Sequence, residues 1–109
     1  MTVKELVKAL EMTVLSQPEE DRNVSGAYAC DLLSRVMTGC NKDDCWITVQ
    51  THLNVLAVAE LSEAACVIIP EGISVEKPII EKARNKGICI LTSEMNAYQL
   101  CWRIHELLL

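Results

Sequence analysis

The chain has 109 residues, a length that fits a single domain over residues 1–109, and 50% of them are hydrophobic. The formal net charge is -5 and the ten Lys and Arg residues form no basic stripe, which argues against nucleic acid as a partner. The chain starts without a signal pattern and contains no apolar run near the roughly 20 residues that span a bilayer, so we expect a cytoplasmic protein without a membrane contact.

The first residues predict a short helix and a brief strand. Thr2 and Glu5 have the spacing of a capping box, and apolar residues at helical intervals follow, which predicts a helix over residues 3–11. Residues 13–15 are expected to form a brief strand. Residues 16–23 contain a proline and several charges and are therefore interpreted as a loop.

The next segment predicts a strand of small residues and a second helix. Residues 24–30 fit a strand or an extended loop, and the glycine within them indicates close approach by a backbone or a ligand. Asp31 is expected to cap the helix that follows, and Gly39 to end it. Residues 40–45 then form a predicted turn.

The second half of the chain alternates apolar runs with helix-like segments. The predicted strands are residues 46–50, 66–69 and 88–91. Strands that alternate with helices are typical of a parallel sheet covered by helices. We therefore expect an α/β fold with a mostly parallel sheet of about four to five strands.

Three helices are expected to follow these strands. The first covers residues 55–65, and the second runs from a cap at Ser74 to a glycine stop at Gly87. The third is expected to begin with Ser93 as its cap. Its inward side chains recur at helical spacing and are Ala97, Leu100, Cys101, Ile104 and Leu108.

The six cysteines are interpreted as reduced thiols. Three disulfides would be the alternative for a secreted domain, but Cys66 and Cys89 lie within apolar strand-like runs. No Cys-x-x-Cys motif occurs, and no Cys or His pairs have zinc-finger spacing. We expect neither a metal site nor a cofactor.

A candidate ligand site follows from the fold, because the carboxyl ends of parallel strands meet at one edge of a sheet. Helix starts at this edge favour anions, so a phosphate could rest against Thr51, His52 and Ser93. The alternative is that these polar residues only cap helices. His52 is the best single candidate for a functional side chain, with a loop hydrogen bond as its alternative role.

No catalytic motif is present. The chain lacks a nucleophile elbow, a phosphate-binding loop and a dinucleotide fingerprint, and no pair of carboxylates has a spacing that supports acid–base chemistry. An enzyme that uses His52 or a reactive thiol at Cys30 is the lowest-ranked hypothesis. We therefore expect no catalytic residues.

The order of these segments resembles the DRTGG domain family. The resemblance rests on the run Val24–Ser34, the strands near Trp46 and Cys66, and the segment Ala83–Ser93. Where the family has its Gly-Asp-Arg-Thr run, this chain has Gln50, Thr51 and His52. Where the family has its Gly-Gly turn, this chain has Glu71 and Gly72. The similarity covers nearly the whole chain.

The resemblance implies a fold like the N-terminal domain of HPr kinase and a non-catalytic role. Related domains are regulatory or dimerising parts of phosphotransacetylases and of pyrophosphatases that carry CBS domains. Standalone members accompany genes of iron hydrogenases, which implies a redox or hydrogenase-associated partner protein.

Two functional hypotheses follow. The first is a regulatory or interaction domain that forms a homodimer, with the apolar end Leu107–Leu109 either in the subunit contact or folded onto its own core. The second is a sensor for a nucleotide or another phosphorylated metabolite. Its predicted ligand-binding residues are Gln50, Thr51, His52, Asn54, Gly72, Thr92 and Ser93.

Overall fold

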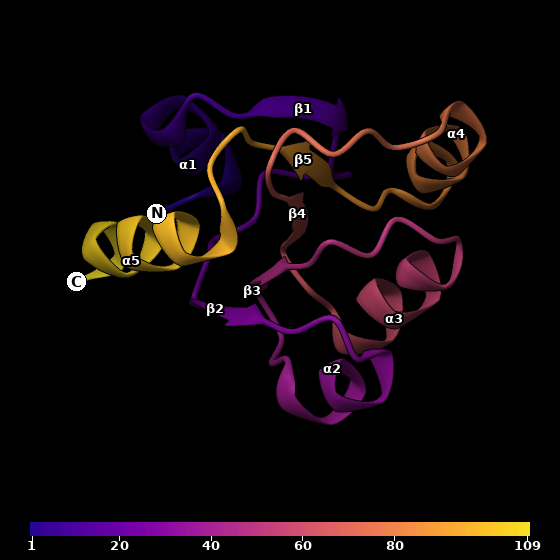
Figure 1. Cartoon of the computed structure of the whole chain (residues 1–109), viewed down its shortest axis with the longest axis horizontal. Helices are drawn as coiled ribbons and strands as arrows, with labels where there is room; N and C mark the ends of the chain where they lie inside the picture. Colours follow the sequence, from indigo (N-terminus) through magenta and orange to yellow (C-terminus); the bar gives the residue numbers. More distant parts are fainter.

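The computed structural model describes residues 1–109, which form one five-stranded sheet between two layers of helices (Figure 1). The strands are β1 (Thr13–Ser16), β2 (Gly26–Ala29), β3 (Asp44–Ile47), β4 (Cys66–Ile69) and β5 (Ile90–Thr92). The helices are α1 (Val3–Leu10), α2 (Leu33–Gly39), α3 (Asn54–Ser62), α4 (Lys77–Lys86) and α5 (Ala97–Leu108). None of these helices is long and apolar enough to cross a membrane.

The sheet has the strand order β1-β5-β4-β3-β2. Strands β2, β3, β4 and β5 are parallel, and β1 alone runs antiparallel to its neighbour β5. The predicted α/β fold with a mostly parallel sheet is therefore confirmed. Because the four parallel strands point the same way, the segments that follow them meet at one edge of the sheet.

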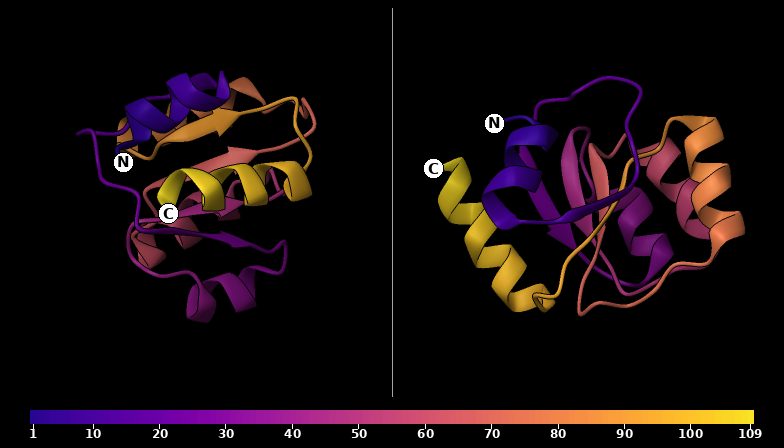
Figure 2. Two further views of the ribbon diagram at one scale, coloured as in Figure 1. Left: turned by 90° about the vertical axis from the view of Figure 1, so that its left-hand side faces the viewer. Right: turned by 90° about the horizontal axis from the view of Figure 1, so that it is seen from above.

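Each face of the sheet carries its own apolar core. Helices α1 and α5 cover one face, and α2, α3 and α4 cover the other (Figure 2). Neighbouring residues of a strand point to opposite faces, so Ile47 packs in the first core and Trp46 in the second. Both β3 and β4 are buried along their whole length, as expected for strands covered on both sides.

The strands agree with the prediction in place and differ in their ends. Residues 66–69 are confirmed as β4, but β3 begins at Asp44, inside the predicted turn 40–45, and ends at Ile47. The start was missed because Asp44 is polar and does not resemble part of a buried strand. Asp44 is nevertheless buried, and its Oδ2 accepts a hydrogen bond from the Asn41 amide at 2.9 Å, which offsets the cost of burial.

Two predicted helix caps, Asp31 and Ser74, are wrong. The Asp31 carboxylate bonds to the segment after β3 instead, and α2 begins at Leu33 without a side-chain cap. Helix α4 begins at Lys77, three residues after Ser74, again without a side-chain cap. Pro78 in its first turn supplies the helical φ angle that helps the start.

The third predicted cap, Ser93, is also wrong. The side chain of Asn96 accepts a hydrogen bond from the Gln99 amide at 2.9 Å, and Gln99 bonds back to Asn96 at 3.0 Å. This reciprocal pair is a capping box, the motif that the sequence correctly predicted at Thr2 and Glu5.

Of the three C-terminal leucines, Leu107 and Leu108 form the end of α5 and Leu109 follows it. Leu107 and Leu108 are partly buried and pack against the first core, whereas Leu109 is 90% exposed. The alternative in which the end folds onto its own core therefore describes two of the three residues. Leu100 and Ile104 are fully buried, as the helical spacing predicted.

Candidate functional site

The segments after the four parallel strands form the carboxyl edge of the sheet, defined here as residues 30–32, 48–54, 70–72 and 92–95. All seven predicted ligand-binding residues belong to this edge. Hydrogen bonds divide the edge into two separate clusters.

The first cluster joins the ends of β2 and β3. Oδ1 of Asp31 accepts hydrogen bonds from the Thr48 hydroxyl at 2.8 Å and from the Val49 amide at 2.9 Å. The Thr48 hydroxyl also accepts from the Gln50 amide at 3.1 Å, and Gln50 Nε2 donates to the Asp31 carbonyl at 3.2 Å. The backbone amide and the side-chain Nε2 of Gln50 thus donate within this cluster instead of to a ligand.

His52 lies just outside the first cluster, at the start of α3. Its Nδ1 accepts a hydrogen bond from the Asn54 amide at 3.2 Å, and its carbonyl accepts from the Val55 amide at 3.0 Å. Both His52 and Asn54 are exposed, and the side chain of Thr51 makes no hydrogen bond. The His52 ring therefore satisfies one helix-start amide and leaves Nε2 as its free ring nitrogen.

The second cluster joins the ends of β4 and β5. The Ser93 carbonyl accepts a hydrogen bond from the Gly72 amide at 2.9 Å, and the buried Ser93 hydroxyl accepts from the Met95 amide at 3.1 Å. Gly72 has φ +64, and a Cβ there would lie 2.7 Å from a carboxylate oxygen of Glu94. Glycine fits this turn because it tolerates both constraints.

The predicted residues are therefore brought to one edge but not into one network. No hydrogen bond joins His52 or Gln50 to Ser93 or Gly72. Several amides that could bind an anion are already used within the clusters, which the sequence could not reveal. Thr92, the last residue of β5, is half-buried and pairs with Thr13 in β1.

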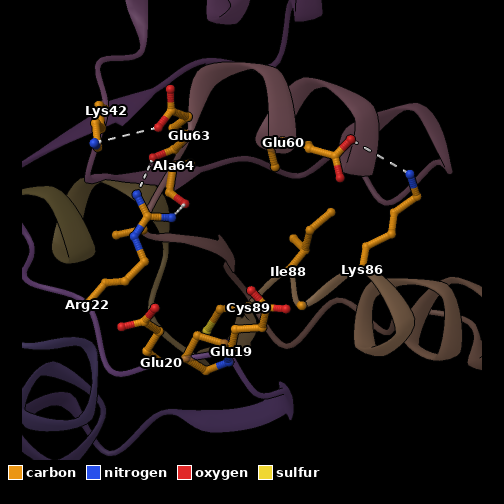
Figure 3. A pocket seen from close by; sticks show the side chains of 14 residues that line it. Glu19, Glu20, Arg22, Lys42, Glu60, Glu63, Ala64, Lys86, Ile88 and Cys89 are labelled. Atoms are coloured by element: carbon orange, nitrogen blue, oxygen red, sulfur yellow. Dashed lines mark hydrogen bonds and ion pairs between the residues drawn. The ribbon is translucent and has the colours of Figure 1, made fainter.

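Sequence reasoning missed a cavity at the opposite edge, where the parallel strands begin (Figure 3). The cavity measures about 410 Å³ and is lined by the loop before β2, the end of α3 and the segment before β5. Its walls carry two ion pairs, Lys42 with Glu63 at 3.7 Å and Lys86 with Glu60 at 3.9 Å.

Arg22 is the central side chain of this edge. Its guanidinium donates to the Asp43 carboxylate, to the Ala64 carbonyl at 2.9 Å and to the Glu63 carbonyl at 2.6 Å. It thus fixes the loop before β2 to the turns that precede β3 and β4. The only sequence signal was a single arginine that follows three acidic residues.

All six cysteines are free thiols, and four of them lie in the interior. Burial raises the pKa of Cys89 to about 12 and that of Cys40 to about 11. A hydrogen bond from Cys66 Sγ to Cys45 Sγ, 3.5 Å long, raises the pKa of Cys66 well above its ordinary value. Thiols held in the protonated form are poor nucleophiles and poor metal ligands.

No group of three or more His, Cys, Asp or Glu side chains converges as a metal site. Cys30 at the carboxyl edge is half-buried, and its Sγ donates to the Leu32 carbonyl at 3.8 Å. Neither Cys30 nor His52 has a side chain hydrogen-bonded to it that would act as a catalytic partner.

A family model described as the DRTGG domain matches residues 5–107. Comparison with curated proteins gave no match. Among solved structures, the chain is similar to the CBS and DRTGG domains of the regulatory region of Clostridium perfringens pyrophosphatase, which were crystallised in complex with the activator diadenosine tetraphosphate. The TM-score is 0.70 and the identity is 13%, over 91% of this chain and 44% of that chain. The likeness shows a shared fold, and this chain spans less than half of that region.

Proposed function

Because the chain belongs to the DRTGG domain family, we propose that it is a non-catalytic regulatory domain that acts by contact with other polypeptides, including a second copy of itself. The raised pKa values of its buried thiols and the lack of a partner for His52 support a role without catalysis. A cytoplasmic location and a redox or hydrogenase-associated partner remain predictions of the sequence.

The exposed side of α5 is the observation that carries the proposed self-association. Tyr98 is 79% exposed, Trp102 is 47% exposed and Leu109 is 90% exposed. Tyr98 and Trp102, four residues apart, lie along one side of α5, and Leu109 directly follows the end of the helix. Aromatic and aliphatic side chains gathered on a surface are typical of protein contacts.

Light scattering across a dilution series tests the proposed self-association. We expect a dimer at high concentration and a monomer on dilution, and we expect Trp102→Glu to move the transition to higher concentration. Leu61→Glu is the matched control, because Leu61 is 65% exposed on α3, away from this surface. A monomer at every concentration, or equal effects of the two variants, would contradict the proposal.

A nucleotide sensor is the second candidate function. The similar pyrophosphatase region was solved with diadenosine tetraphosphate, and the carboxyl edge of this chain exposes Leu32, Val49 and Leu53, on which a base could pack. The proposed ligand-binding residues are those predicted from the sequence, Gln50, Thr51, His52, Asn54, Gly72, Thr92 and Ser93.

Thermal unfolding with millimolar diadenosine tetraphosphate, ATP or AMP tests the sensor. Binding would raise the midpoint in a concentration-dependent way, and His52→Ala would reduce the shift. The control is His105→Ala, which removes the other histidine from a different surface. The absence of stabilisation by all three compounds would rule out this candidate.

A further inference from the structure

Strand β2 leaves one side of its backbone open, because it is the last strand of the sheet on its side. The Cys30 amide donates to the Ile47 carbonyl at 3.3 Å, and the register pairs Tyr28 with Trp46. In this parallel register Gly26 and Tyr28 bond to β3, so alternation directs the N–H and C=O groups of Ala27 and Ala29 away from it. The bridge between Thr2 and Asn23 covers the chain only upstream of β2.

The opposite edge of the sheet is protected. Strand β1 has an irregular register between Val14 and Ser16, which interrupts its outer row of hydrogen-bonding groups. Arg84 of α4 also donates to the Leu15 carbonyl from Nε at 3.3 Å and from a terminal nitrogen at 3.1 Å. The β1 edge is thus protected in two ways. The β2 edge contains no charged residue and no proline, so an added strand can pair with β2.

A groove lies beside this open edge, between β2 and α5. Its volume is about 390 Å³. The side chains that define it are Ala27, Ala29, Cys101, Ile104, His105 and Leu108. It contains no Lys, Arg, Asp or Glu, although the chain has a net charge of -5. An occupant with uncharged side chains therefore matches the groove, and small side chains match the exposed Ala27 and Ala29.

The layers around β2 favour a single strand over a second copy of the domain. Helix α5 lies over β2 on one face (Figure 1), and on the other face the Tyr28 hydroxyl donates to the Arg35 carbonyl of α2 at 3.5 Å. A second copy paired through β2 would have to fit its own α5 and α2 next to these helices. An extended peptide carries no such layers and has only the groove to fill.

We propose that an extended peptide segment of a partner protein binds in this groove and pairs with β2 as a sixth strand. Main-chain groups of Ala27 and Ala29 bond to the peptide, and small apolar side chains at alternate peptide positions face α5. This inference rests on the proposed role as an interaction domain and adds the site and the chemistry of the partner.

The experiment uses a phage-displayed library of random nonapeptides, selected against the full chain. Synthetic peptides from the selection are then titrated into the wild type, Ala29→Arg and Leu61→Arg. Ala29 is exposed in the groove, so its arginine leaves the core intact but places a charge where the peptide packs. We expect at least about tenfold weaker binding by Ala29→Arg and unchanged binding by Leu61→Arg.

Amide exchange provides the second readout. Bound peptide should slow exchange at Ala27 and Ala29, whose amides point away from β3 in the free chain. Failure to select any peptide, equal affinity of the two variants, or unchanged exchange at these amides would overturn the inference. A dimer that Ala29→Arg dissociates would assign the edge to a second copy instead. If light scattering finds a monomer at every concentration, the proposed self-association fails, and peptide binding still decides this inference separately.

Discussion

The carboxylate of Asp31 accepts a hydrogen bond from the hydroxyl of Thr48 at 2.8 Å, and this contact ties the end of β2 to the end of β3. Thr48 is only 1% exposed, so its hydroxyl has no access to bulk water. Asp31→Ala should lower the free energy of unfolding by about 2 kcal/mol, because it leaves this buried hydroxyl and the Val49 amide without their acceptor. Urea denaturation measures the loss.

Asp31→Asn is the matched control for this contact. The amide oxygen of asparagine still accepts hydrogen bonds but carries no charge, so we expect a smaller loss, about 1 kcal/mol. If Asp31→Ala were as stable as the wild type, the contact would not hold these two strand ends together.

The fold could be predicted because its information is local. Buried strands such as β4 consist of consecutive apolar residues, and the alternation of such runs with helical segments indicates a parallel sheet. One error falls where a polar residue bonds outside its own neighbourhood. Asp31 has the character of a helix cap, but its carboxylate bonds to a residue 17 positions later.

The site was less predictable for the same reason. The sequence placed His52 and Ser93 at one edge, but it could not show that neighbouring amides are already bonded within two clusters. The clamp at the other edge was not predicted at all. It joins Arg22 to a carbonyl 42 residues away, and no local pattern encodes such a contact.

Arg22→Lys tests that clamp. Lysine keeps the charge but lacks the planar group that reaches Asp43 and the carbonyls of Glu63 and Ala64 together. We expect a loss of about 2 kcal/mol in the free energy of unfolding. Arg35→Lys on the exposed side of α2 is the control and should change stability by less than about 0.5 kcal/mol. Similar effects of the two substitutions would show that the fork geometry of Arg22 contributes little.

Gly87, the residue that ends α4, should not tolerate a side chain. Its φ is +70, and a Cβ there would lie 2.7 Å from Cγ of Glu19. Gly87→Ala should therefore lower the thermal midpoint, with a cost of about 1 kcal/mol from the backbone alone. Combining it with Glu19→Ala should recover only the part that is due to the contact. Full recovery in the double variant would mean that the left-handed backbone causes no strain.

The buried thiol of Cys89 should make the fold sensitive to alkaline pH. Its pKa is raised from 9.0 to about 12, chiefly by burial. Below pH 9 the thiol is protonated in both the folded and the unfolded chain, and its full contribution to stability is present. Between pH 9 and about 12 only the unfolded chain loses the proton, so the free energy of unfolding falls by up to about 1.4 kcal/mol per pH unit.

Urea denaturation of the wild type and of Cys89→Val between pH 8 and pH 11 isolates this effect. Valine keeps an apolar side chain of similar size, so any change in packing shifts the free energy of unfolding equally at every pH. Only the loss of the thiol changes the slope against pH, and we expect a shallower slope above pH 9 in Cys89→Val. Parallel curves for the two proteins would show that Cys89 does not titrate differently in the folded chain.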